Sequence, residues 1–260
     1  MMKIKQSVCF PIMKPGDVGY DEFFGACAEI GYDAVEFWGR GDNFDDVVGI
    51  AKKHNLDVAS VIGHGGMGNG LNNRDYHDEC ERELCESIDI AAAHGIPGII
   101  CFSGNRYEGA TDEECVDIAA EGLRRIAPHA EAKGVNVNIE LLNSKRDHVG
   151  YQCDNTAWAV AVAKAVGSPN VKVLYDIYHM QIMEGDVIET IRANIEWIGH
   201  FHTAGVPGRQ DMDETQELNY AAIAKAISET DYDLYVGHEF CPKGDAIEAL
   251  RKTFPIFCPI

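Results

Sequence analysis

Residues 111–142, TDEECVDIAAEGLRRIAPHAEAKGVNVNIELL, hold one helix and one strand in succession. Thr111 and the acidic residues after it are typical of a helix N-terminus, and Gly134 is typical of a helix end. From Val135 to Leu142 apolar and polar residues largely alternate, which favours a strand. The sequence therefore predicts a helix over 112–133 followed by a strand over 135–142.

The same alternation of short apolar runs and longer helical patterns extends over the whole sequence. We expect strands over residues 4–10, 34–38, 57–63, 98–103, 135–142, 171–177, 198–204 and 234–240. We expect helices over residues 20–30, 44–54, 75–94, 112–133, 154–166, 186–195, 219–229 and 245–253. Strands that alternate with helices pair in parallel through right-handed crossovers. The 260 residues therefore predict one α/β domain over 1–260, a closed (β/α)8 TIM barrel.

A doubly wound open sheet is the alternative fold for this alternation. That fold often carries a glycine-rich phosphate loop after its first strand, whereas residues 9–15 read CFPIMKP. The glycine-rich stretch GHGGMGNG at residues 63–70 follows the third predicted strand, and no helix opens directly on it. We interpret residues 63–70 as a flexible loop over a barrel mouth, in which His64 could contact a substrate.

The charge of the chain limits its partners. It has 42 acidic and 22 basic residues, a formal net charge of −20, while its 46% apolar and 25% charged residues are typical of globular proteins. Such a surplus of negative charge repels nucleic acids and anionic membranes unless one face is locally basic. It does not disfavour a metal cation. We therefore expect a small-molecule partner, and neither nucleic acid nor a membrane.

The cysteines and the start of the sequence indicate a cytoplasmic protein. The start, MMKIKQSVCFPIMKPGD, lacks the apolar stretch of a signal peptide, and no run approaches the length of a membrane span. Nine cysteines, an odd number without a C-x-x-C motif, predict reduced thiols. Cys9, Cys101 and Cys241 lie in or beside predicted strands, where we expect small buried apolar side chains.

Polar side chains recur where four successive predicted strands end. The fifth strand ends near Glu140, the sixth reaches Asp176, the seventh carries His202 and the eighth ends in Glu239. In a parallel barrel the carboxyl ends of the strands share one rim. One such residue alone is commonly a solvated loop residue, but four on successive strands predict a site for a divalent cation. Carboxylates with one imidazole suit Mg²⁺ or Mn²⁺, with Co²⁺ or Zn²⁺ as alternatives.

Strand parity assigns faces to further residues. If Glu140 points into the barrel, so does Asn138, because side chains alternate along a strand. His200 shares a face with His202, whereas His238 lies on the face opposite Glu239. A histidine in such a position is more often a hydrogen-bonded core residue than a ligand, and for His200 and His238 this alternative stays open. Trp38 and Phe102 lie near strand ends and could line the site or belong to the core.

Several stretches of the second half together resemble one known family. They are YDIYHMQ at 175–181, EGD at 184–186, HTAGVPGR at 202–209, ELNY at 217–220 and GHEF at 237–240. With NIELLN at 138–143, they are similar to the hydroxypyruvate isomerase family. That family belongs to the xylose isomerase-like TIM barrels, together with the ketose 3-epimerases.

The resemblance implies a role for each matching residue. It implies that Glu140, Asp176, His202 and Glu239 bind a divalent metal, and that Glu140 and Glu239 are the catalytic acid/base pair. The resemblance also implies that His179 and Arg209 contact the substrate. The chain departs from the family at His202, where hydroxypyruvate isomerases commonly have glutamine and ketose epimerases have histidine. Barrels of this kind often associate, so a homo-oligomer is compatible with the sequence.

The implied reaction is a proton transfer on an α-hydroxy carbonyl compound. The cation would act as a Lewis acid on the substrate oxygens and stabilise an enediolate. One glutamate would remove the α-proton, and the other would return a proton to the adjacent carbon or to the opposite face of the same carbon. Arg209 has the planar fork that suits a carboxylate. We expect a short hydroxy-oxo acid such as hydroxypyruvate, with a ketose as the alternative substrate.

Other functional classes remain as alternatives. An endonuclease-IV-like metal hydrolase could use the same barrel, but the net charge of −20 argues against a DNA-facing rim. A non-catalytic sugar-binding barrel and a lyase or dehydratase acting on a cyclic polyol are further alternatives. The expected function is therefore a metal-dependent isomerase of a short hydroxy-oxo acid or sugar.

Overall fold

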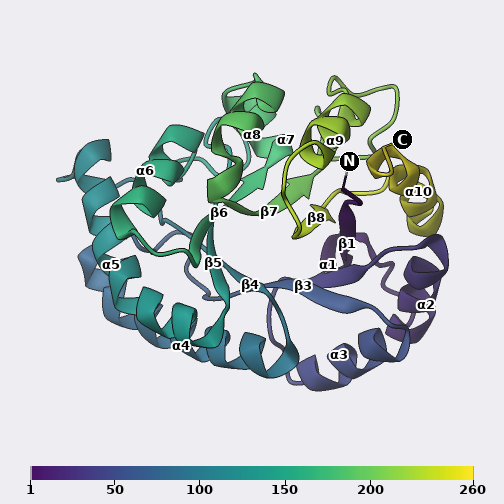
Figure 1. Ribbon diagram of the computed structural model, residues 1–260, viewed down its shortest axis with the longest axis horizontal. Helices are drawn as coiled ribbons and strands as arrows, with labels where there is room; N and C mark the ends of the chain where they lie inside the picture. Colours follow the sequence, from purple (N-terminus) through teal and green to yellow (C-terminus); the bar gives the residue numbers. More distant parts are fainter. Residues whose placement is uncertain (1, 260) are drawn as a thin grey trace. The chain divides into compact units, whose positions relative to one another are not determined.

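The structure of the protein is a computed structural model that describes residues 2–259. Within that range, parallel strands form a closed barrel in the order β1 to β8 (Figure 1). The strands are β1 Lys5–Cys9, β2 Ala34–Phe37, β3 Asp57–Ile62, β4 Gly98–Cys101, β5 Asn136–Glu140, β6 Val171–Asp176, β7 Ile198–Thr203 and β8 Tyr235–His238. Every predicted strand is present, and the predicted (β/α)8 TIM barrel is confirmed.

The helices follow the predicted ranges closely. They are α2 Tyr20–Ile30, α3 Phe44–Lys53, α4 His77–His94, α5 Asp112–Lys133, α6 Thr156–Val166, α8 Val187–Asn194, α9 Tyr220–Ser228 and α10 Ala246–Thr253. Three 3₁₀ turns occur among the described residues, η1 Arg74–Tyr76, η2 Ile195–Trp197 and η3 Phe254–Phe257. Two short helices, α1 Phe10–Met13 and α7 Ile177–Met183, were not predicted. The prediction that Ile177 ends a strand is wrong, because helix α7 begins there.

Residues 111–142 form the predicted helix and strand, here α5 and β5. The hydroxyl of Thr111 accepts a hydrogen bond from the backbone N–H of Glu114, and the Glu114 carboxylate accepts one from the backbone N–H of Thr111. This capping box satisfies two backbone donors at the start of α5. Gly134 ends the helix with a φ of 67°, a left-handed conformation that glycine adopts without steric strain.

The chain divides into two compact units. The first contains the described residues up to Val61, Asp186–Ile195 and the described residues from Phe201 onward, and the second contains Ile62–Gly185 and Glu196–His200. Within the first unit, β1 pairs in parallel with both β2 and β8, β2 with β3, and β7 with β8. Within the second unit, β5 pairs with β4 and β6, and helices α4, α5 and α6 lie outside these strands (Figure 1).

The described cysteines are free, and most of them are buried. Cys9 and Cys101 are buried, as predicted. The same prediction for Cys241 is wrong, because Cys241 lies three residues beyond the end of β8 and is exposed. Of the helices formed by residues 2–259, none has both the length and the apolar character needed to cross a membrane.

Candidate active site

In the first unit, the carboxylate of Glu239 directly follows β8 and is buried, with 5% of its surface exposed. The indole Nε1–H of Trp38 donates to Glu239 Oε1 over 2.7 Å, and the thiol of Cys9 donates to the same oxygen over 3.6 Å. Arg209 Nη2 donates to Glu239 Oε2, and His202 Nδ1 lies 3.3 Å from that oxygen. The end of β8 therefore holds a buried carboxylate whose two oxygens are each contacted by other side chains.

The surroundings of Glu239 keep it ionised. Burial alone raises the pKa of this carboxyl, since a low-dielectric environment disfavours the charged form. The charges of His202 and Arg209 and the hydrogen bonds from His202 and Trp38 together outweigh burial, so the pKa of Glu239 lies well below its ordinary value. A buried carboxylate that stays ionised can accept a proton or bind a cation.

A second buried carboxylate, Glu36 on β2, orients the ring of His202. Glu36 Oε2 lies 3.0 Å from His202 Nε2, and Ser7 Oγ donates to Glu36 Oε1 over 2.5 Å. A Cβ at Gly237 would lie 2.1 Å from Glu36 Oε1, so only glycine leaves room for this carboxylate on the neighbouring strand β8. The ring of His202 thus lies between two carboxylates, and with a metal ion on Nδ1 the Nε2–H would still donate to Glu36, as in carboxylate–histidine–metal arrangements.

Glu36 was not predicted as a site residue. The only signal was a charged residue in the middle of the short apolar run Ala34–Phe37. A glutamate that is 1% exposed in the centre of a strand must be compensated, because unpaired buried charge is costly.

In the second unit, Glu140 ends β5 and Asp176 ends β6, and both side chains are buried. The hydroxyl of Tyr151 donates to the backbone carbonyl of Glu140 over 3.0 Å. Asp176 also caps helix α7, since its Oδ1 accepts the backbone N–H of His179 over 3.0 Å. The unpredicted helix α7 therefore fixes the position of the Asp176 carboxylate relative to His179.

The ring of His179 has a defined tautomer. Its Nδ1 accepts the backbone N–H of Asn143 over 3.1 Å and lies 2.6 Å from the side-chain Nδ2 of the same residue. Because two donors face Nδ1, the proton of the neutral ring is on Nε2. Nε2 lies 3.7 Å from Asp176 Oδ2. His179 thus presents an N–H on the side of Asp176, and its predicted contact with a substrate stays a prediction.

Among residues 2–259, two groups of buried side chains could hold a metal ion, with the ligand atoms of each group within 4.8 Å of one another. One group is Glu36, His200 and His202. The other is Glu140, Asp176, His202 and Glu239, the four residues that the family resemblance implies as ligands. Three carboxylates and one imidazole form a donor set suited to a divalent cation.

Arg209 lies in the loop after β7, and its side chain turns toward Glu239. Its φ of 54° is unusual for a residue other than glycine. The loop is closed by two backbone hydrogen bonds, one from the N–H of Gly205 to the carbonyl of Gln210 and one from the N–H of Cys241 to the carbonyl of Arg209, both 2.7 Å long. The loop therefore holds the Arg209 guanidinium against Glu239, while its role toward a substrate stays a prediction.

Two predicted histidines lie in packed surroundings. His238 Nδ1 lies 2.8 Å from the hydroxyl of Thr203, His238 Nε2 lies 3.0 Å from Gln6 Oε1, and burial lowers the pKa of His238 to about 3. The alternative of a core histidine is confirmed for His238. His64 is 5% exposed, and its Nε2 accepts the backbone N–H of Phe102 over 2.8 Å. His64 thus anchors the glycine-rich loop, and a contact between His64 and a substrate stays a prediction.

His64 should make the folded protein sensitive to acid. Burial lowers the pKa of His64 from 6.5 to about 4, although Glu83 raises it slightly. Below about pH 6.5 the unfolded chain binds a proton that the folded chain rejects, so stability is lost as the pH falls towards 4. Between pH 7 and pH 5 the free energy of unfolding should fall by about 2 kcal/mol more in the wild type than in His64→Gln.

Denaturant titrations at the two pH values measure this difference. Glutamine keeps an acceptor for the N–H of Phe102 but carries no titrating ring, so it separates protonation from the lost hydrogen bond. Equal losses of stability in both proteins would show that His64 does not titrate in this way.

The chain is similar to known proteins over most of its length. A family model described as xylose isomerase-like TIM barrel matches residues 24–255. Over 169 residues the chain is 36% identical to 2-oxo-tetronate isomerase of Cupriavidus necator, which covers 65% of this chain and 64% of that protein. Over 178 residues it is 32% identical to hydroxypyruvate isomerase of Escherichia coli, which covers 68% of each chain. The resemblance predicted from the sequence motifs is confirmed.

The match to the first of these relatives spans just under two thirds of that protein's length, 64%. Among solved structures, one described as AP endonuclease, family 2, from Brucella melitensis is 28% identical, with a TM-score of 0.83. It covers 98% of this chain and 99% of that chain. This likeness agrees with the closed barrel found here.

Proposed function

Because the chain belongs to the xylose isomerase-like TIM barrel family, we propose that it is an isomerase acting on a short hydroxy-oxo acid. The substrates would be of the kind named for its relatives, hydroxypyruvate and 2-oxo-tetronate. One observation carries this proposal. Glu140, Asp176, His202 and Glu239 are buried, and each offers a ligand atom within 4.8 Å of the others. Such a set combines two general bases with a place for a divalent cation.

The donor set suits a metal ion on chemical grounds. Burying three carboxylates is costly, by several kcal/mol per ion, unless positive charge compensates them. Glu140, Asp176, His202 and Glu239 would hold the cation, with Mg²⁺ or Mn²⁺ favoured by the oxygen-rich set and Co²⁺ or Zn²⁺ as alternatives. When bound, a divalent cation supplies Lewis acidity toward a carbonyl and its neighbouring hydroxyl oxygen.

In this proposal the protein's two glutamates move the proton. One of Glu140 and Glu239 removes the proton on the carbon next to the carbonyl, which leaves an enediolate. The other delivers a proton to the neighbouring carbon, and the hydroxyl proton passes to the former carbonyl oxygen, so that the carbonyl and hydroxyl exchange places. Glu239 is ionised near neutral pH and can therefore take up the first proton, while its lowered pKa makes it a weaker base than an ordinary glutamate.

Three further residues would orient the substrate. His179 presents its Nε2–H on the side of Asp176, where it could donate to a substrate oxygen. Arg209 carries a guanidinium whose planar fork matches a carboxylate, and it is 22% exposed at its side chain. His64 belongs to the glycine-rich loop and completes the proposed contacts. A terminal carboxylate on the substrate would bind Arg209 best.

A ketose 3-epimerase is the second candidate function. His202 supports it, since hydroxypyruvate isomerases commonly have glutamine at this position and ketose epimerases have histidine. The same two glutamates would serve, with the proton returned to the opposite face of the same carbon.

A DNA hydrolase is the third candidate, in view of the likeness to the Brucella melitensis protein described as an AP endonuclease. The net charge of −20 opposes it.

The setting of the enzyme forms part of the same proposal. We expect a single barrel domain that works in the cytoplasm, where the nine cysteines would remain reduced. A homo-oligomer is compatible with this proposal.

Proton exchange into D₂O tests the proposed function. The protein, supplied with Mn²⁺ or Mg²⁺, should exchange the α-proton of hydroxypyruvate or 2-oxo-tetronate, as followed by ¹H NMR. Exchange of a C5 or C6 ketose alone would favour the epimerase. If no compound in this panel exchanges, the isomerase proposal fails, and cleavage of a duplex with an abasic site would favour the hydrolase.

A further inference from the structure

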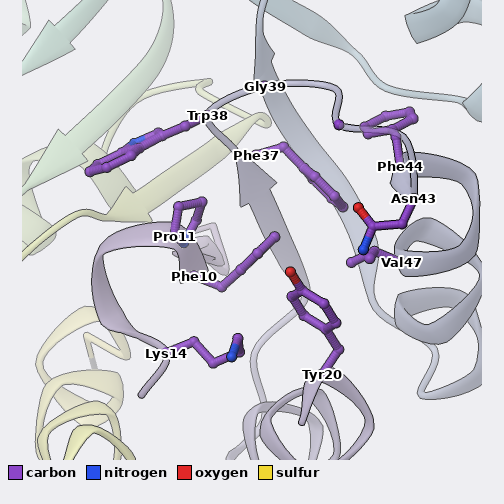
Figure 2. A pocket seen from close by; sticks show the side chains of 11 residues that line it. Phe10, Pro11, Lys14, Tyr20, Phe37, Trp38, Gly39, Asn43, Phe44 and Val47 are labelled. Carbon is purple, nitrogen blue, oxygen red and sulfur yellow. The ribbon is translucent and has the colours of Figure 1, made fainter. Parts of the chain in front are cut away.

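A pocket with aromatic walls lies in the first unit, next to Glu239. Its volume is about 320 Å³, and it lies between helix α1, the loop after β2 and the starts of helices α2 and α3 (Figure 2). Trp38 connects the pocket to the candidate site, because it lines the pocket and donates to Glu239 over 2.7 Å. The Trp38 side chain would therefore separate a ligand in this pocket from Glu239, a proposed catalytic glutamate.

The walls of the pocket are fixed before any ligand binds. The rings of Phe10 and Phe37 meet edge to face with centroids 4.9 Å apart, and Phe37 meets Phe44 at the same distance. Trp38 is 42% exposed, yet its hydrogen bond to Glu239 holds the indole in place. An exposed tryptophan held in this way is a preformed platform for a flat ligand, since little conformational entropy is lost on binding.

The polar groups of the pocket are neutral or cationic. Tyr20 directs its hydroxyl toward the space between the phenylalanine rings, and the amide of Asn43 lies on the other side of Phe37 (Figure 2). The ammonium of Lys14 donates to the carbonyls of Pro15 and Val18 over 3.0 and 2.7 Å and lies 5.0 Å from the Tyr20 ring centroid. Aromatic faces with a few hydroxyl, amide and ammonium donors suit a ligand with apolar C–H faces and hydroxyl edges.

The pocket is larger than a short hydroxy-oxo acid requires. At about 30 Å³ for each water molecule, 320 Å³ corresponds to about ten waters, whereas hydroxypyruvate has only seven non-hydrogen atoms. Nor does a carboxylate explain the aromatic walls, since its charge favours donors rather than ring faces. The pocket is therefore suited to a part of the substrate that does not react.

We propose that this aromatic pocket binds a neutral sugar ring carried by the substrate, so that the reacting hydroxy-ketone belongs to a larger glycoside. This inference rests on the proton transfer of the proposed function, but it replaces the short hydroxy-oxo acid by a hydroxy-ketone that carries a sugar ring. The binding of the ring itself rests on the pocket alone. The ring would stack on an aromatic wall of the pocket and place a hydroxyl near that of Tyr20. Trp38, whose indole turns away from Tyr20 and donates to Glu239, would face the reacting part of the substrate. Binding energy from such a remote group can increase the rate at the reacting carbons.

A substitution at Gly39 tests the pocket without touching Glu239. A Cβ at Gly39 would meet no atom within 4 Å, so Gly39→Leu should fold and narrow the pocket that Gly39 lines. Gly49 on helix α3 also has open space at its Cβ and does not line the pocket, so Gly49→Leu is the matched control. Thermal unfolding would confirm that both variants are folded.

The first measurement is a titration with methyl β-D-glucopyranoside, followed through the indole ¹H–¹⁵N signal of Trp38. The signal should shift in the wild type and in Gly49→Leu but not in Gly39→Leu. Absence of a shift in the wild type, or the same shift in Gly39→Leu, would overturn the proposal. A shift with phenol but none with the glucoside would also overturn it, since the pocket would then prefer an aryl group.

The second measurement compares α-proton exchange of lactulose, a ketose that carries a sugar ring, with that of D-fructose. The wild type should show a kcat/KM about tenfold higher for lactulose, which corresponds to about 1.4 kcal/mol of remote binding energy. Gly39→Leu should lose that preference, and Gly49→Leu should keep it. If the glucoside binds but neither lactulose, D-fructose, hydroxypyruvate nor 2-oxo-tetronate exchanges, the proposed isomerase function fails while the sugar site stands. Equal kcat/KM values for lactulose and D-fructose would overturn the proposal that the sugar ring in the pocket belongs to the substrate.

Discussion

Glu239→Gln should reduce α-proton exchange by about 10²- to 10⁴-fold, the range that a positioned general base contributes. Glutamine has nearly the same shape, but it keeps one acceptor oxygen, so it can accept from Trp38 or from Arg209, which contact different oxygens of the wild-type carboxylate. It cannot take up the α-proton, and it is a weaker ligand for a divalent cation because it is uncharged. The measurement is the rate of deuterium incorporation into hydroxypyruvate at saturating Mn²⁺.

Glu189→Gln is the matched control for this experiment. Glu189 lies on helix α8 with 66% of its side chain exposed, and it pairs with Arg192 on the surface. Exposed ion pairs contribute little to stability, so this variant should keep the wild-type rate. A Glu239→Gln enzyme that exchanges as fast as the control would remove Glu239 from the reaction and leave Glu140 to act alone.

The strand ends of the candidate site could be predicted because the barrel imposes its own geometry. Once eight strand–helix repeats are recognised, the carboxyl ends of the strands must share one rim. Polar residues at those ends, such as Glu140 and Glu239, then stand out against the apolar runs before them. The prediction of these site residues therefore needs no knowledge of contacts between residues that are distant in the sequence.

Helix α7 could not be predicted from the same pattern. The residues Ile177, Tyr178 and Met180 are as apolar as the strand before them, and the helix is only 7 residues long. Its start depends on the Asp176 carboxylate, which accepts the backbone N–H of His179 in place of a water molecule. A single aspartate between two apolar runs carries too little information to divide strand from helix.

Glu36 and the aromatic pocket were missed for a different reason. Glu36 has a role only because Ser7 and His202 meet it from strands β1 and β7, and because Gly237 leaves space for it on β8. The pocket likewise depends on helix α1 and the loop after β2 approaching each other. Such features arise from tertiary packing, which local periodicity does not encode.

Asp176→Asn and Asp176→Ala should separate the two roles of Asp176. Asparagine caps helices as well as aspartate does, so Asp176→Asn should keep helix α7 and the stability of the metal-free protein. Alanine cannot accept the backbone N–H of His179, so Asp176→Ala should lose about 0.5–2 kcal/mol of stability. Thermal and denaturant unfolding of chelator-treated protein would measure this difference.

The affinity for a metal ion should depend on the charge of the side chain at position 176, and not on whether that side chain caps helix α7. Removing a group that only supports a metal ligand costs about 10- to 100-fold in affinity, so loss of a direct carboxylate ligand should cost about 100-fold or more. Both variants should therefore bind Mn²⁺ weakly in calorimetric titrations, although only Asp176→Ala is destabilised. Wild-type affinity in Asp176→Asn would mean that Asp176 serves the helix alone, and the cation would then have to be held by the histidine and glutamates that remain.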